Sequence, residues 1–136
     1  MNLLAPLHSL AGWLRHRNER NLGRWGEERA HRWLRSHGFT VVARNWRPPQ
    51  GGGEIDLIAW EKETLVFVEV KARTSDDSSA PERGISQDKM LALRRAARDY
   101  IRRAGAEDKL IRFDVITFTG EALQYFRDAF SLNVSL

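Results

Sequence analysis

The chain has 136 residues, and its Lys and Arg outnumber its Asp and Glu by 22 to 18, giving a net charge of +4. One domain with a sizeable core is expected at this length, and the lack of cysteine excludes disulfides, thiolate metal sites and cysteine nucleophiles. The basic balance favours an anionic partner. No run is apolar and long enough to span a membrane, so we expect a soluble, cytoplasmic protein.

The first 21 residues form a segment that is distinct in sequence from the predicted domain. They lack the basic start and the cleavage site of a signal peptide. Two interpretations remain open: a frayed extension, or an amphipathic helix that docks on the domain, a second copy or a membrane surface. We therefore divide the chain into an extension over residues 1–21 and a single domain over residues 22–136. The leucines at helical spacing in the extension are Leu3, Leu7, Leu10 and Leu14.

A helix is predicted over residues 22–37, because an apolar stripe recurs at helical spacing and ends at His37-Gly38. Glu27 lies on this apolar stripe and not on the wet face. An inward carboxylate needs a partner. Glu27 therefore either forms a salt bridge with a nearby arginine or leans toward other acidic residues of a site.

A strand with a β-branched centre is predicted next, over residues 39–45. A loop follows it and ends in three glycines, Gly51 to Gly53. The glycines either form a plain connector or allow a ligand to approach the backbone closely.

Two further strands, over residues 54–60 and 64–73, carry the most informative pattern. The short polar segment between them suits an antiparallel hairpin, in which Trp60 pairs with Leu65. The second strand alternates between two apolar faces, which predicts that it is buried on both sides.

The hairpin register brings charged side chains together. Asp56 falls opposite Glu69, with Cβ atoms about 5 Å apart, and Glu54 falls opposite Lys71. Two facing carboxylates are destabilising unless their charge is offset. Either Lys71 neutralises an acid in a salt-bridged hairpin, or Asp56 and Glu69 share a divalent cation such as Mg²⁺.

The remainder of the chain alternates again between helix and strand. A polar loop over residues 74–84 precedes a helix over residues 87–104 with Ser86 as its cap. A strand follows over residues 111–119, then an edge strand over residues 122–126 and a tail from residue 128. The helix residues predicted to face inward are Met90, Leu93, Ala97, Tyr100, Ile101 and Ala104, and those on a basic outer flank are Arg94, Arg95, Arg98, Arg102 and Arg103.

Asp114 is an acid inside the apolar strand over residues 111–119. A salt bridge to Arg112 or to a helix arginine is favoured over a catalytic role for it, because a buried carboxylate is normally paired.

Asp56 followed by Glu69-Val70-Lys71 on the next strand resembles the signature of the PD-(D/E)XK nucleases. The wider pattern is more specific, and it resembles the YraN family of small bacterial nuclease-like proteins. In layout it is also similar to archaeal Holliday-junction resolvases. The matching segments, within about residues 23–130, are Gly26-Glu27, GEIDLIA from Gly53, VFVEVKAR from Val66, Lys89, and RFDVITF from Arg112.

This resemblance implies an α/β, restriction-endonuclease-like fold with a central mixed β-sheet flanked by helices. It implies that Asp56, Glu69 and the Val70 carbonyl bind Mg²⁺ or Mn²⁺, with Glu27 as a further ligand from the first helix. Lys71 corresponds to the catalytic lysine. The implied activity is that of a Mg²⁺-dependent endodeoxyribonuclease on branched or damaged DNA. Resolvases of the similar type act as symmetric dimers, so a homodimer is expected.

The alternative function is nucleic-acid binding by a protein that keeps the nuclease fold with little or no catalytic activity. RNA stays a candidate beside DNA, because no residue pattern identifies a reader of the 2′-hydroxyl. Under either function, the residues predicted to contact phosphates are Arg47, Arg73, Lys89, Arg94, Arg95 and Arg98.

Overall fold

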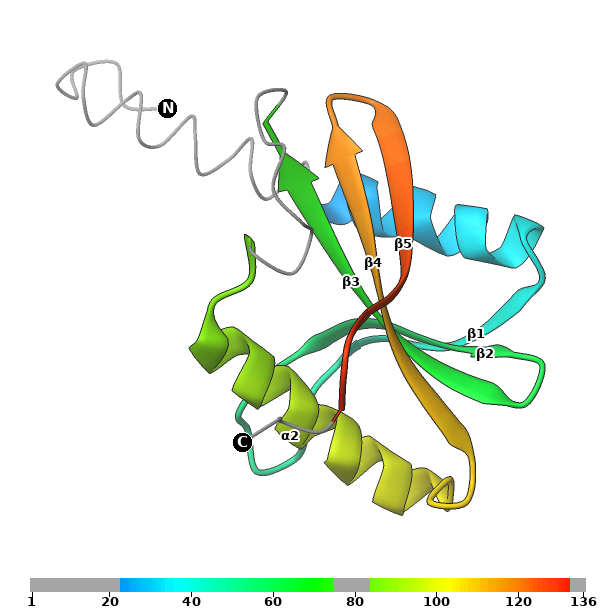
Figure 1. Cartoon of the computed structure of the whole chain (residues 1–136), viewed down its shortest axis with the longest axis vertical. Helices are drawn as coiled ribbons and strands as arrows, with labels where there is room; N and C mark the ends of the chain where they lie inside the picture. The colour runs from blue at the N-terminus through cyan, green and yellow to red at the C-terminus, as the bar shows by residue number, and fades with distance from the viewer. Residues whose placement is uncertain (1–22, 75–83, 133–136) are drawn as a thin grey trace, which may run out of the picture.

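The computed structural model describes residues 23–74 and 84–132. A five-stranded mixed sheet forms the centre, with a helix over residues 23–36 against one face and α2 (Gln87–Ala104) against the other (Figure 1). The predicted α/β class, with a central mixed sheet flanked by helices, is confirmed, and the arrangement agrees with a restriction-endonuclease-like layout. The predicted extension, most of the polar loop over residues 74–84 and the end of the tail lie outside the described residues.

The sheet has the order β1-β2-β3-β4-β5. Neighbouring strands are antiparallel except β3 and β4, which are parallel. Parallel strands need a crossover connection, and α2 supplies it. Among the described residues, no helix has the length and apolar character that crossing a membrane requires. The strands are β1 (Phe39–Trp46), β2 (Ile55–Glu61), β3 (Thr64–Arg73), β4 (Leu110–Thr119) and β5 (Ala122–Phe130).

The β2–β3 hairpin has the predicted register, with Trp60 paired to Leu65. Its turn places Lys62 at φ 54°, as a tight connection requires. The ladder extends to the pair Leu57–Val68 and ends there. The predicted pairing of Glu54 with Lys71 is therefore wrong: Glu54 lies outside the ladder, at the end of the glycine loop, and bonds to Arg47.

The core has two layers, one on each side of β3, as predicted. The α2 side contains Leu65 and Phe67, and the other side contains Val66 and Val68. Ile55, the first residue of β2, packs on the α2 side, whereas Leu57, two residues later, packs on the other side. Ala104 is exposed and not inward, since the helix ends there and Gly105 caps it in the left-handed conformation.

The carboxy-terminal strand is longer than predicted. β5 continues to Phe130, and a residue with positive φ, Asp128, lies within it. The ring of Phe130 stacks on Phe113 with centroids 4.6 Å apart, which accounts for the continued pairing where a tail was expected. Asp114 forms the predicted ion pair with Arg112, at 2.8 Å.

Candidate metal centre

Five segments of the chain meet at a pocket of about 240 Å³ beside the start of β2. They are the amino-terminal half of the first helix, β2, the second half of β3, the first turn of α2 and the end of β4. The sheet brings β2 and β3 together through the hairpin, and the two helices approach from its opposite faces (Figure 1). The charged residues that line the pocket are Glu27, Asp56, Glu69, Lys71 and Lys89.

Asp56 lies just beyond the last backbone pair of the hairpin. Its Oδ2 accepts a hydrogen bond from the Val70 N–H at 2.8 Å. The N–H and C=O of a strand residue project to the same edge, so the Val70 carbonyl also faces the end of β2. Burial raises the pKa of Asp56, and the nearby Glu54 carboxylate adds to this, although the Val70 N–H and the Lys89 ammonium act in the opposite direction.

Glu69 is buried, with 4% of its side chain exposed. Its Oε1 lies 2.5 Å from the Lys89 ammonium, while its Oε2 has no hydrogen-bond partner among the described residues. Burial, together with the negative charge of Asp56, raises the pKa of Glu69 to about 7. No donor among the described residues reaches Oε2, although a protonated Glu69 shares a hydrogen bond with the Asp56 carboxylate, which also raises its pKa.

Glu27 reaches the site from the first helix. Gly26 allows this close approach, because a Cβ there would lie 3.3 Å from the Phe118 ring. Of the two predicted alternatives, Glu27 leans toward the acids: its nearest described partner is Asn45, whose Nδ2 donates at 3.0 Å. Burial and the charge of Asp56 raise the pKa of Glu27.

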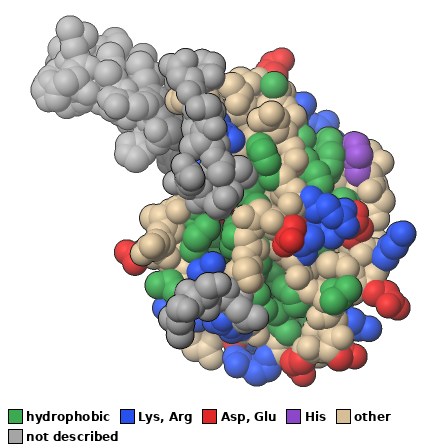
Figure 2. All heavy atoms as spheres, viewed as in Figure 1, with side chains coloured by type: hydrophobic (Ala, Val, Ile, Leu, Met, Phe, Trp, Pro, Cys, Tyr) green, Lys and Arg blue, Asp and Glu red, His purple; other side chains and the backbone are tan. Residues whose placement is uncertain are grey.

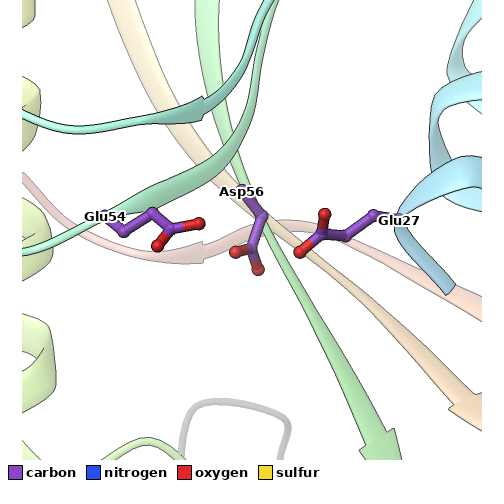
Figure 3. A group of neighbouring side chains, drawn as sticks. All are labelled: Glu27, Glu54 and Asp56. Atoms are coloured by element: carbon purple, nitrogen blue, oxygen red, sulfur yellow. The ribbon is translucent and has the colours of Figure 1, made fainter. Parts of the chain in front are cut away.

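Glu54 belongs to the same group, although it was not predicted as a ligand. One oxygen each from Glu27, Glu54 and Asp56 lie within 4.8 Å of one another, and Figure 3 shows Glu54 and Glu27 approaching Asp56 from opposite sides. The sequence signal for Glu54 was its place two residues before Asp56, but Glu54 precedes β2, so strand alternation does not fix its position.

The glycine loop positions Glu54 because Gly53 packs closely against α2. Gly53 has φ +116°, and a Cβ there would lie 2.8 Å from the Ala92 carbonyl oxygen of α2. Arg47, at the other end of the loop, donates to Glu54 Oε2 at 2.7 Å from Nη2 and at 3.0 Å from Nε. The glycines therefore permit a close approach of α2.

Lys71 lines the pocket with the acids and is partly exposed. Its ammonium lies against the backbone of Gly84, where a Cβ would fall 1.5 Å from Nζ. Lys71 is thus placed at the pocket without being the partner of Glu69 or Glu54 that a salt-bridged hairpin required. Those partners are Lys89 and Arg47.

The residues predicted to contact phosphates come from several elements, and two of them, Arg95 and Arg98, line a pocket together with the glycine loop. Lys89 lines the pocket of the candidate centre, Arg47 is bonded to Glu54, and Arg73 ends β3. Arg94 and Arg98 donate to the carbonyls of Ser131 and Leu132, at 2.8 and 3.0 Å. Arg95 is exposed beside the glycine loop. Basic and acidic side chains are interspersed on the face drawn in Figure 2.

The described residues fit a divalent cation. Hard carboxylate oxygens are the ligands that Mg²⁺ and Mn²⁺ prefer, and three carboxylates lie close enough to share one ion. The unpartnered Oε2 of Glu69 is a buried acceptor in the same pocket. A cation would supply the partner that this oxygen lacks.

A profile of the family described as "Uncharacterised protein family UPF0102" matches residues 26–118. The chain belongs to this family. The YraN resemblance is thereby confirmed at the level of the family. The match begins in the first helix and ends in β4, so it includes every acid of the candidate centre.

Proteins described as UPF0102 in three bacteria are similar along most of their length. The one from Solibacter usitatus is 49% identical over 132 residues, covering 94% of this chain and 100% of the relative. Those from Desulfosudis oleivorans and Hahella chejuensis are 42% and 40% identical, covering 83% and 82% of this chain and 92% and 90% of the relatives.

Proposed function

We propose that this protein is a metal-dependent endonuclease that hydrolyses phosphodiester bonds in DNA, with branched or damaged duplexes as its substrates. The observation that carries the proposal is the buried, unpartnered Oε2 of Glu69 in a pocket shared with Asp56, Glu27 and Lys71. The resemblance of these residues to the PD-(D/E)XK signature supports the same chemistry.

Asp56, Glu69 and the Val70 carbonyl would hold Mg²⁺ or Mn²⁺, with Glu27 completing the ligands from the first helix. When bound, the ion polarises the scissile phosphate and lowers the pKa of a coordinated water. The Val70 N–H holds the Asp56 carboxylate in place through its 2.8 Å hydrogen bond. This bond keeps the ligand geometry fixed before a substrate arrives.

Lys71 supplies a positive charge at the mouth of the same pocket. An ammonium placed there orients the attacking water or stabilises the negative charge that develops on the phosphate. Two more cations are bonded to acids of the centre: the Arg47 side chain, 72% exposed, to Glu54, and the Lys89 side chain, 52% exposed, to Glu69. These cations offset the repulsion between a phosphodiester and the acids of the centre.

The test compares wild type with Lys71→Ala and Asp56→Ala on linear, nicked, flapped and four-way DNA, each with Mg²⁺ or Mn²⁺. We expect metal-dependent cleavage that both variants lose. Lys62→Ala is the matched control, because Lys62 is an exposed lysine in the hairpin turn at the far end of β2. An RNA version of each substrate tests the sugar preference. Absence of cleavage by wild type on every substrate, or full activity in both site variants, refutes the proposal.

Nucleic-acid binding without efficient hydrolysis is the second candidate, and the Lys89–Glu69 ion pair favours it. This pair neutralises one acid of the site without a metal ion. Binding would then be strongly salt-dependent and unaffected by Asp56→Ala. Arg95→Glu is the cleanest probe, because reversing Arg94 or Arg98 also breaks the bonds to Ser131 and Leu132. Unchanged binding by Arg95→Glu, or binding independent of salt, counts against this function.

A further inference from the structure

Lys89 is a protein cation inside the candidate metal centre. Its Nζ lies 2.5 Å from Glu69 Oε1, and this Glu69 carboxylate is 4% exposed. The pocket that contains both side chains also contains Asp56 and Glu27. Lys89 therefore occupies one side of a carboxylate whose other oxygen is unpartnered.

The helix itself does not account for a lysine at this position. Lys89 lies in the first turn of α2, where the helix dipole disfavours a positive charge. The capping bond at this turn uses the Lys89 backbone N–H, which donates to Ser86 Oγ at 3.1 Å. A different side chain at position 89 would leave that bond in place. The position of the ammonium is thus explained by Glu69 and not by the helix.

The acids of the centre offer one set of closely spaced oxygens. Glu27, Glu54 and Asp56 present oxygens within 4.8 Å of one another, which is the separation that a single shared ion needs. Glu69 adds its free Oε2 to the same pocket. The position beside Glu69 Oε1, where a second ion would bind this carboxylate, is already occupied by the Lys89 ammonium.

We propose that Lys89 takes the place of a second divalent cation, so that the centre binds one metal ion. The inference rests on the metal centre of the proposed function and adds its stoichiometry. Removing the ammonium would leave both oxygens of Glu69 unpaired in a buried position. A buried carboxylate without a partner is costly, and a second ion would supply that partner.

The experiment is calorimetric titration of the full chain with Mn²⁺ at mildly alkaline pH. Wild type is expected to bind one ion per chain, Lys89→Met two, and Lys89→Arg one, since arginine keeps the charge. Spin coupling between the two Mn²⁺ ions, seen by electron paramagnetic resonance, is expected in Lys89→Met alone. Two ions in wild type, or one ion in Lys89→Met, overturns the inference while leaving the proposed function intact. If wild type binds no ion, the proposed metal-dependent function is refuted, and the one-ion stoichiometry that rests on it is refuted as well.

A double variant keeps the test decisive if Lys89→Met folds poorly. Lys89→Met with Glu69→Gln removes both charges of the pair, and replacement of a buried ion pair by neutral groups is often tolerated. It is expected to unfold at a midpoint close to that of wild type and to bind one ion. The oxygens of Glu27, Glu54 and Asp56 remain for that ion, which binds more weakly without the Glu69 carboxylate, and the charge that a second ion would neutralise is gone. Two ions in the double variant would contradict the role assigned to Glu69 and Lys89.

Discussion

Two carboxylates are buried on neighbouring strands of this sheet, and their surroundings differ. Asp114 on β4 is fully buried and accepts hydrogen bonds from Arg112 Nε and Nη2, at 2.8 and 2.9 Å, and from the Asp128 N–H at 2.9 Å. The Tyr125 hydroxyl donates to it as well. Glu69 on β3 pairs with Lys89 and, when protonated, shares a hydrogen bond with Asp56, but no donor among the described residues reaches its Oε2.

The difference separates a structural acid from a candidate ligand. Both residues interrupt apolar strands, so the residue pattern alone gives each the same appearance. At Asp114 the chain supplies a guanidinium fork, a hydroxyl and a backbone N–H, which leave no need for an external group. At Glu69 the chain leaves an acceptor open next to Asp56. The first arrangement stabilises the fold, and the second leaves room for a cation.

Removing the guanidinium at the structural acid should have the largest effect on stability. Arg112→Ala leaves Asp114 charged and buried, and breaking such a pair costs about 3–5 kcal/mol. Denaturant unfolding measures the loss. Arg127→Ala is the control: its side chain is 58% exposed and pairs with Glu61, and we expect a loss below about 1 kcal/mol. Equal losses in the two variants would show that the buried network is not the stabilising feature.

The stability of the metal-free protein should fall as the pH rises from 4.5 to about 7. Glu69 keeps its proton in the folded state over this interval, whereas the unfolded chain has lost it. The stability that Glu69 contributes is therefore fully present below its pKa in the unfolded chain. It is lost as the pH rises through its pKa in the folded protein. The upper limit of this stability change is about 3 kcal/mol. Because the Asp56 and Glu69 carboxyls interact, they titrate as a pair. Denaturant unfolding at a series of pH values measures this, and Glu69→Gln should flatten the profile. An unchanged profile in that variant would assign the effect to other groups.

Metal binding should stabilise wild type and not the variant Asp56→Asn. At a Mn²⁺ concentration about 100 times the dissociation constant, a single site adds about 2.7 kcal/mol. The asparagine Oδ1 can still accept from the Val70 N–H, so the fold is kept while the charge is lost. Thermal unfolding with and without Mn²⁺ gives the difference. Asp88→Asn removes an exposed acid in the first turn of α2 and should retain the wild-type response. A full response in Asp56→Asn would place the ion elsewhere.

The smallest expected effect concerns the glycine loop that places Glu54. Gly53 and Gly51 both have positive φ, but a Cβ would meet the Ala92 carbonyl only at Gly53. Both alanine variants carry backbone strain, and Gly53→Ala should be less stable than Gly51→Ala by about 1–2 kcal/mol. It should also bind Mn²⁺ more weakly, because Glu54 moves with the loop. Denaturant unfolding measures the stability and calorimetry the Mn²⁺ affinity. Equal stability and equal affinity in the two variants would show that packing of Gly53 against α2 does not position Glu54.

Local periodicity was sufficient for most of the fold. The bounds of β3 and the Trp60–Leu65 pair were predicted because two-sided alternation and a two-residue turn determine them. The cap of α2 at Ser86 followed from its residue type. Asp114 was correctly assigned to a salt bridge with Arg112, which is two residues away on the same strand face.

The partners within the site could not be predicted, because they depend on packing between distant segments. Glu54 leaves the ladder since Gly53 contacts Ala92 on α2, and no local pattern encodes that contact. The ion pair between Lys89 and Glu69 depends on how α2 packs across the sheet, because the two residues lie on different elements. The basic flank of α2 was predicted from periodicity, but the use of Arg94 to hold Ser131 depends on where the chain passes after β5.

An anomalous difference map from crystals grown with Mn²⁺ would locate the ion. We expect a peak in the pocket beside Asp56, with Oε2 of Glu69 among its ligands and the Lys89 ammonium still on Oε1. We expect no peak at the Arg112–Asp114 network. A crystal that binds Mn²⁺ elsewhere on the described surface, with an empty pocket at Asp56 and Glu69, would contradict the proposed metal centre.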